Sequence, residues 1–266
     1  MEYALIAVFT VLGLAIASFL NVLIDRLPNN ESIVYPPSHC PACQQRLAAR
    51  DLVPFFSYLR LRGRCRSCGA PIPRRVLGVE IGVGVMWPLL FWHYGLTAQF
   101  AIIAVYCCLF VVLMIIDLEH GLLLNRLIFP GMIFAVIISI FLSGTIDVFH
   151  LGGSLALLPP TIAQAGIGAA IGFGITLLIV FLSRGGMGLG DVKMAALIGL
   201  VAGFPTVIFT LILAAIIGGI VAIVMLAAKK KKRKEAIPLG PALAIAAIVT
   251  IIWGFDIIIG YLNLIG

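Results

Sequence analysis

Charged residues are scarce in this chain of 266 residues: Asp, Glu, Lys and Arg together make up only 11% of it. Hydrophobic residues make up 62%, and the mean hydropathy is +1.18. A water-soluble domain needs far more polar side chains than this to cover its surface. The composition therefore excludes a soluble globular protein and predicts an integral membrane protein.

The apolar residues form runs long enough to cross a bilayer as helices, because a hydrocarbon core of about 30 Å needs roughly 17 to 25 apolar residues. Seven such runs begin near Tyr3, Val76, Thr97, Leu127, Thr161, Thr206 and Pro241, and a shorter run extends from Asp191 to Gly203. The pattern predicts an all-α polytopic membrane protein with about eight transmembrane helices.

Basic residues are missing from every second predicted loop. Of the 18 Lys and Arg residues, nine lie from Arg26 to Arg75 and six in the run at 229–234. Because cytoplasmic loops carry an excess of positive charge, both groups should lie inside and both chain termini outside. The net charge of +7 is therefore interpreted as a topology signal, with no nucleic-acid partner. The run at 229–234 either anchors this topology or binds anionic membrane lipid.

One polar stretch, residues 25–75, interrupts the membrane pattern and indicates a small cytoplasmic domain. We therefore expect a first transmembrane helix at 1–24, this domain, and a seven-helix membrane domain at 76–266. About 50 residues are too few to bury a self-sufficient core, so the small domain needs a covalent or metal staple. No internal repeat is evident anywhere in the chain.

Four of the six cysteines lie in this domain as two Cys-X-X-Cys pairs. The segments "CPAC" at 40–43 and "CRSC" at 65–68 each present two thiolates that reach one tetrahedral metal ion. Disulfides are the alternative, but the reducing environment on the cytoplasmic side argues against them. We therefore predict that Cys40, Cys43, Cys65 and Cys68 hold a structural Zn²⁺ ion.

The chain has only 11 acidic residues, so a carboxylate at the membrane boundary is costly and points to a function. Asp117 ends the third predicted helix and Asp191 begins the sixth, and the loop alternation places both at the cytoplasmic face. Two carboxyl groups that meet in a low dielectric share one proton. One of them can then deprotonate water while the other polarises a carbonyl oxygen, which is the chemistry of peptide hydrolysis. We expect Asp117 to carry the proton, because the helix dipole favours charge on Asp191.

A glycine-rich segment, "GMGLGD", leads directly into Asp191. We expect Gly188 and Gly190 to adopt backbone conformations that a Cβ would forbid, so that an extended substrate can approach the main chain. Lys193 either offsets charge at this site or is one more positive-inside residue.

Six motifs follow one another along most of the chain: "ASFLNVLIDRLP" at 17–28, "PPSHCPAC" at 36–43, "SYLRLRGRCRSCGAPIPRR" at 57–75, "DLEHGLLLN" at 117–125, "GMGLGDVKM" at 186–194 and "PLGPALA" at 238–244. In this order they resemble the type IV prepilin peptidase family, aspartic proteases of the GxGD kind. The resemblance implies an eight-helix enzyme of the bacterial inner membrane. Such an enzyme removes the short basic leader of type IV prepilins, and of type II secretion pseudopilins, at the cytoplasmic membrane face.

The resemblance also implies roles for particular residues. Asp117 and Asp191 occupy the positions of the two catalytic aspartates, and the four cysteines match the cytoplasmic zinc domain of members that also methylate the new N-terminus. The methyl donor, S-adenosylmethionine, rests on the resemblance alone, because no glycine-rich adenosyl-binding turn is recognisable. Leu124 and Leu239 depart from the Pro and Phe that are common in the family.

Several alternatives stay open at this point. Asp191 could simply cap a helix, and Glu119 could take the place of Asp117 in the pair. An ion-coupled transporter would also use intramembrane carboxylates and glycine-broken helices, although it leaves the cysteine domain without a role. A membrane-anchored zinc module that only docks partners would need neither aspartate.

Overall fold

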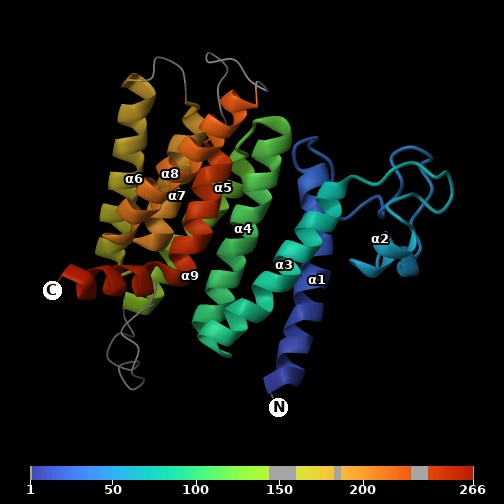
Figure 1. The fold of residues 1–266 in the computed structure, drawn as a ribbon, viewed down its shortest axis with the longest axis horizontal. Coiled ribbons are helices and arrows are strands. Elements are labelled where there is room, and N and C mark those ends of the chain that lie inside the picture. Colours follow the sequence, from blue (N-terminus) through green and yellow to red (C-terminus); the bar gives the residue numbers. More distant parts are fainter. Residues whose placement is uncertain (1, 144–159, 183–186, 229–238, 266) are drawn as a thin grey trace. The chain divides into compact units, whose positions relative to one another are not determined.

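The computed structural model describes residues 2–143, 160–182, 187–228 and 239–265, and the regular secondary structure in these ranges is helical (Figure 1). The long helices are α1 (Glu2–Arg26), α3 (Arg74–Tyr94), α4 (Ala98–His120), α5 (Asn125–Ser143), α6 (Ile162–Leu182), α7 (Leu189–Ala202), α8 (Thr206–Ala227) and α9 (Gly240–Ile265). A 3-10 turn η1 (Ala49–Asp51) and a short helix α2 (Phe56–Arg60) lie between α1 and α3. The all-α prediction is confirmed for the described residues. The basic run at 229–234 and residues 184–186 lie outside them.

Five helices, namely α1, α3, α4, α6 and α8, are long and apolar enough to cross a membrane. The described apolar parts of α5 and α9 are shorter, Asn125–Phe141 and Gly240–Gly254, and α7 has 14 residues. These helices support a multi-pass membrane protein, whereas a total of about eight spans stays a prediction.

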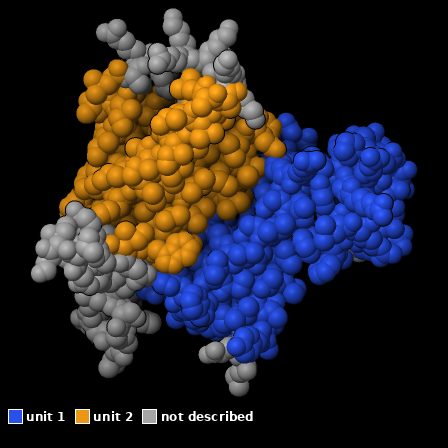
Figure 2. All heavy atoms as spheres, in the orientation of Figure 1, with its two compact units in different colours: residues 1–108 blue, residues 109–266 orange. Residues whose placement is uncertain are grey.

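The chain forms two compact units, residues 1–108 and residues 109–266 (Figure 2). The boundary falls inside α4, so the first unit contains α1 to α3 with the beginning of α4, and the second contains the rest of α4 with α5 to α9. The predicted domain limits at residues 24 and 75 stay predictions.

In the first unit, α1 packs antiparallel to α3. The two helices approach each other closely at Gly13 of α1. A Cβ on this residue would lie only 2.8 Å from Trp87 Cβ of α3. At the other end of the pair, Asn21 Nδ2 of α1 donates a hydrogen bond to Val76 O of α3 at 3.2 Å. The pairing therefore brings together the two ends of the segment that carries the cysteines.

In the second unit, α6 and α7 are in direct backbone contact. A Cβ on Gly168 of α6 would collide with Gly199 O of α7, and one on Gly172 would collide with Ala195 O. The spacing of Gly168 and Gly172 is the small-xxx-small pattern that lets membrane helices pack closely. Since α5 and α9 also pack on α7, the helix that carries Asp191 is held from several sides.

Candidate active site and metal centre

Asp117 and Asp191 both lie at helix ends, in the last turn of α4 and the first turn of α7. Helix α4 ends at His120 because Gly121 adopts a φ of 64°, a left-handed conformation, and its N–H donates to Asp117 O at 2.9 Å. At the start of α7, the N–H of the N-cap residue Gly188 donates to Asp191 Oδ2 at 3.3 Å. The local sequence thus fixes each aspartate at a helix terminus.

The two carboxyl groups face one point, the position that a Cβ would occupy on Gly240. This point is in contact with Asp117 Oδ2, 2.9 Å from Asp117 Cγ and 3.4 Å from Asp191 Oδ1. Both side chains are buried, with Asp117 6% and Asp191 8% exposed. The fold therefore brings together two acidic residues that are far apart in the chain.

Gly240, the first residue of α9, completes this arrangement, a role that sequence reasoning did not assign. It is buried, and its missing side chain leaves the space that Asp117 Oδ2 occupies. The sequence predicts an apolar run that begins near Pro241, and proline favours the first turn of a helix. Nothing in the sequence, however, indicates that this helix begins beside α4 and α7.

The surroundings of the two carboxyl groups differ, as acid–base chemistry requires of a base and its partner acid. Asp191 Oδ2 accepts the Gly188 N–H at the N-terminus of α7, where the helix dipole stabilises negative charge. Asp117 Oδ2 is buried and has no hydrogen-bond partner among the described residues. A proton on Asp117 would remove the cost of burying a second charge beside the first, so one proton shared by the pair fits this geometry.

The structure corrects the role expected for the two glycines before Asp191. Gly188 has φ −82° and ψ 150°, which is extended backbone open to any residue, and Gly190 lies within α7. The expectation that they adopt conformations forbidden to a Cβ is therefore wrong. Gly190 instead provides space, because a Cβ there would lie only 3.0 Å from Leu123 Cβ.

Lys193 and Glu119 each lie two positions from one of the two aspartates. Lys193 contacts residues of α5, and Glu119 is exposed. Lys193 Nζ donates to Asn125 Oδ1 at 3.0 Å and lies 5.9 Å from the centre of the Phe129 ring, so it connects α7 to α5. Its supporting role stays a prediction. Glu119 is exposed whereas Asp117 is buried, and the geometry favours Asp117 as the partner of Asp191.

The second candidate site, a cysteine cluster, lies in the first unit. The Sγ atoms of Cys40, Cys43, Cys65 and Cys68 all lie within 4.8 Å of one another, and those of Cys40 and Cys68 are 3.8 Å apart. A Zn²⁺ ion with tetrahedral Zn–S bonds of about 2.3 Å holds its sulfurs about 3.8 Å apart. Backbone N–H groups of Cys68 and Ser67 lower the pKa of the Cys65 thiol to about 6, whereas desolvation and the neighbouring thiols raise the pKa of Cys68 to about 11. The cluster is therefore suited to a tetrahedral metal ion.

The two cysteine pairs lie in loops that repeat the same backbone hydrogen bonds. In the first loop Cys40 N–H donates to Gln45 O and Gln44 N–H donates to Cys40 O. The loop at Cys65 forms the equivalent bonds, and Gln44 and Gly69 at matching positions have φ of 59° and 71°. This internal repeat escaped sequence reasoning because the two loops share few residues besides the cysteines.

Known proteins match both halves of the chain. The family model for the bacterial peptidase A24 N-terminal domain matches residues 11–94, and the model for the type IV leader peptidase family matches residues 104–223. A prepilin leader peptidase/N-methyltransferase of Stutzerimonas stutzeri is 30% identical, covering 95% of this chain and 92% of its own length. A protein of the same name from Xanthomonas campestris pv. campestris is 31% identical, covering 96% and 93%. Another from Bacillus subtilis is 25% identical, covering 98% and 99%.

The chain belongs to the type IV leader peptidase family.

The two family matches divide the candidate sites between them. The type IV leader peptidase match contains Asp117 and Asp191, the N-terminal match contains all four cysteines, and Gly240 follows both. These relatives are named as enzymes, so the transporter alternative is not favoured. Family membership together with five apolar helices makes the chain a multi-pass protein of the inner membrane. No solved structure is significantly similar to the chain.

Proposed function

We propose that this protein removes the leader peptide of type IV prepilins and pseudopilins and then N-methylates the new N-terminus with S-adenosylmethionine. Relatives that align over nearly the whole chain are named for both activities. The observation that carries the cleavage activity is the pair of buried carboxyl groups, Asp117 and Asp191, that face one point beside Gly240.

In the proposed reaction, ionised Asp191 takes a proton from water while protonated Asp117 donates a hydrogen bond to the carbonyl oxygen of the scissile peptide bond. The water oxygen attacks the carbonyl carbon, and the proton then passes to the leaving nitrogen. The Gly188 N–H and the α7 dipole support this division of roles, because both stabilise charge on Asp191.

We place both aspartates at the cytoplasmic membrane face, in an eight-span topology with both termini outside. The clustering of Arg and Lys in alternate loops supports this orientation. A prepilin leader is basic and remains inside, whereas the helix that follows it is apolar and lies in the bilayer. The bond to be cut then lies at the inner membrane boundary, at the level of the aspartate pair.

We also propose that Cys40, Cys43, Cys65 and Cys68 hold a structural Zn²⁺ ion in a cytoplasmic domain at 25–75. The close approach of the four Sγ atoms supports this proposal. The ion would cross-link two loops of a segment that is too short to build a core of its own.

The cleavage proposal is tested with Asp117→Asn and Asp191→Asn in the full chain. Each change removes one carboxyl group but preserves its shape, so cleavage of a purified prepilin should fall at least about 100-fold, the usual contribution of general acid–base catalysis. Product formation in detergent or liposomes measures the rate. Glu119→Gln, at an exposed carboxyl two positions from Asp117, is the control and should keep cleavage. Wild-type cleavage by either Asn variant would contradict the proposal.

A further inference from the structure

Four large apolar side chains are exposed on α2 and on the residues that lead into it. Leu52 is 42%, Val53 45%, Phe56 63% and Leu59 53% exposed. They lie outside the candidate membrane spans, in the polar stretch at 25–75. A water-facing surface seldom gathers apolar side chains in this way, and where it does, the surface marks contact with a protein or a membrane. We call these four residues the α2 surface.

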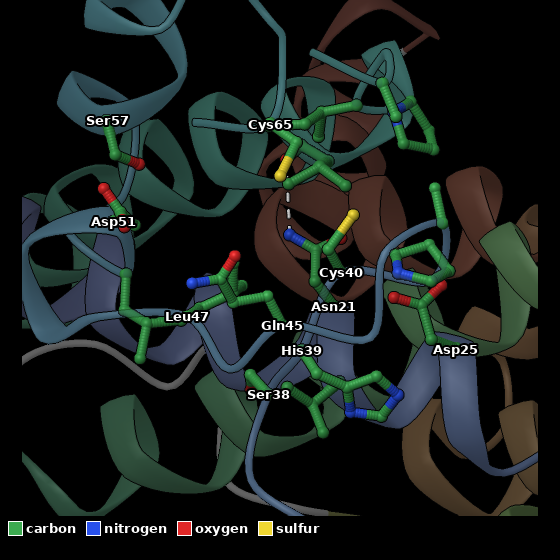
Figure 3. A pocket seen from close by; sticks show the side chains of 18 of the residues that line it. Asn21, Asp25, Ser38, His39, Cys40, Gln45, Leu47, Asp51, Ser57 and Cys65 are labelled. Carbon is green, nitrogen blue, oxygen red and sulfur yellow. Dashed lines mark hydrogen bonds between the residues drawn. The ribbon is translucent and has the colours of Figure 1, made fainter. Parts of the chain in front are cut away.

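Helix α2 turns one side to the cysteine loops and the other side away from them. Ser57 and Tyr58 line the cavity beside these loops (Figure 3), and Tyr58 Oη donates to Ile72 O at 3.4 Å. Phe56 and Leu59 are three positions apart, which makes them neighbours on one helix face, and they are the two most exposed residues of the α2 surface. The apolar side chains are therefore presented outward by a helix whose opposite side is fixed.

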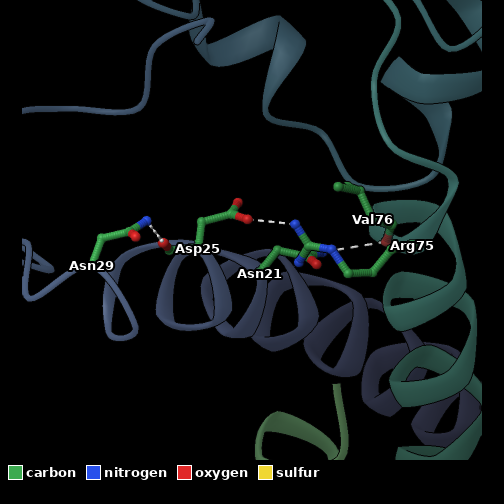
Figure 4. A network of polar contacts seen from close by, with 5 residues as sticks. All are labelled: Asn21, Asp25, Asn29, Arg75 and Val76. Atoms are coloured by element: carbon green, nitrogen blue, oxygen red, sulfur yellow. Dashed lines mark hydrogen bonds and ion pairs between the residues drawn. The ribbon is translucent and has the colours of Figure 1, made fainter. Parts of the chain in front are cut away.

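An ion pair between α1 and α3 marks the level at which these helices enter the membrane. The Arg75 guanidinium donates to the Asp25 carboxylate (Figure 4). The pair lies at one end of two candidate spans, Tyr3–Arg26 and Arg74–Tyr94. Because charged side chains are costly inside the hydrocarbon core, the membrane boundary lies close to this ion pair.

Glu80 holds the start of α2 beside α3, past this boundary. It is buried, and it lies five residues further along α3 than Arg75, which is about 8 Å at the rise of an α-helix. Its Oε2 accepts the N–H of Phe55, the N-cap residue of α2, at 2.7 Å. Figure 1 accordingly shows α2 beside the α1–α3 pair, at a level between the two ends of the pair. The α2 surface is thus exposed at the depth of the membrane interface.

We propose that the α2 surface inserts into the cytoplasmic leaflet of the membrane and anchors the cysteine loops there. The inference goes beyond the proposed reactions and rests on the cytoplasmic location proposed for residues 25–75. Interfacial segments bury their apolar side about 5 to 10 Å into the boundary between headgroups and acyl chains, which agrees with the contact between Phe55 and Glu80. A soluble partner does not reach side chains at this depth, so lipid is the occupant.

The charge beside the α2 surface fits anionic lipid. Residues 50–64 contain four arginines and one acid, Asp51, which forms an ion pair with Arg66. Arg60 ends α2 and Arg62 follows it, and both are exposed. Arginine side chains bury their stems along apolar surface and keep the guanidinium group at the lipid phosphates.

Photochemical cross-linking to lipid tests the location. Phe56→p-benzoylphenylalanine is made in the full chain, in vesicles of phosphatidylethanolamine and phosphatidylglycerol, and mass spectrometry measures the lipid adducts. Phe173→p-benzoylphenylalanine, at an exposed position of the apolar helix α6, is the positive control, and the same change at exposed Ser67 of the second cysteine loop is the negative control. We expect position 56 to exceed position 67 at least about tenfold in adduct yield.

Adducts at position 173 without adducts at position 56 would overturn the anchor. Adducts of position 56 with an added prepilin in place of lipid would identify a substrate-docking surface, which also overturns it. The adducts should contain phosphatidylglycerol above its share of the vesicle lipid. Arg60→Gln should lower this enrichment, whereas Arg46→Gln, at an exposed arginine of the first cysteine loop, should keep it. Adducts in proportion to the vesicle composition would refute the role of the arginines.

Trypsin digestion of inside-out membrane vesicles tests the apolar side chains. Phe56→Ser combined with Leu59→Ser should speed the cut after Arg62 at least about tenfold, because the segment then leaves the interface. The cut after Arg46 reports unfolding of the cysteine loops and should keep its wild-type rate. An unchanged rate after Arg62 would refute the anchor and leave the proposed cleavage activity intact, since the aspartate variants test that activity separately. Wild-type protein that trypsin cuts at neither site, in vesicles opened with detergent or intact, supports burial of both sites, whereas cuts only after opening would overturn the cytoplasmic location and the anchor with it.

Discussion

Gly240 leaves room for the two carboxyl groups because it has no side chain. A Cβ there would be in contact with Asp117 Oδ2 and would occupy the space where the two acids converge. Gly219 of α8 is a useful comparison, because a Cβ added to it meets no atom within 4 Å. The two glycines lie in helices of the same unit and differ in what surrounds them.

We predict that Gly240→Ala reduces kcat/KM for prepilin cleavage by at least about tenfold. The added methyl group must displace Asp117, and a shift of about 1 Å in a catalytic group can cost 100-fold in rate. Steady-state cleavage assays measure the effect, with Gly219→Ala as the control that keeps wild-type activity. If Gly240→Ala cleaves normally, Gly240 has no part in the geometry of the pair.

The two aspartates could be found in the sequence because acids are rare in this chain, and a buried charge in a membrane is too costly to keep without a purpose. Gly240 could not be found in the same way. The importance of Gly240 depends on which helices meet at it. This is a property of tertiary structure that a single sequence does not display.

At the scale of helices, the α6–α7 contact determines where Asp191 lies. Gly172 touches the backbone of α7, since a Cβ on it would lie 3.1 Å from Ala195 C and still closer to Ala195 O. Gly174, two positions along α6, faces open space. Dispersion contacts between closely packed backbones stabilise this pair, since lipid offers no hydrophobic driving force for association.

We predict that Gly172→Ala lowers the free energy of unfolding by about 1 to 3 kcal/mol, the usual cost of overpacking. It should also reduce cleavage, because α7 must move away from α6 and carries Asp191 with it. Thermal unfolding in detergent and the cleavage assay measure the two effects. Gly174→Ala should be neutral or slightly stabilising, since alanine has the higher helix propensity. Equal stability of the two variants would show that the contact is unimportant.

Helix positions were largely predictable, because apolar runs and membrane thickness determine them. The run expected from Asp191 to Gly203 corresponds to α7, Leu189–Ala202, and the run from Thr206 to α8, Thr206–Ala227. The partner of each helix was not predictable. Gly168 and Gly172 show the small-xxx-small spacing, but only the structure shows that they face Gly199 and Ala195.

At the scale of the whole molecule, the two compact units correspond closely to the two family matches, which cover residues 11–94 and 104–223. The cysteine cluster belongs to the first unit, and the aspartate pair to the second. The polar segment at 25–75 was visible from composition. The boundary inside α4 was not, because one continuous apolar helix crosses it.

We predict that Cys40→Ser removes the metal ion and unfolds the cysteine loops, since metal binding in small domains supplies the folding free energy. Metal analysis should find one zinc ion per wild-type chain and none in the variant. Trypsin should cut the arginine-rich segment at least about tenfold faster in the variant. Ser67→Ala, at an exposed residue between two of the cysteines, is the control and should retain zinc. Wild-type protein without zinc would contradict the prediction.

The backbone contact between α6 and α7 also couples the positions of the two helices. Because main-chain atoms meet at Gly168, Gly172 and Gly199, neither helix can slide past the other without separating. A displacement of α7 that carried Asp191 away from Asp117 would therefore have to take α6 with it or break this contact.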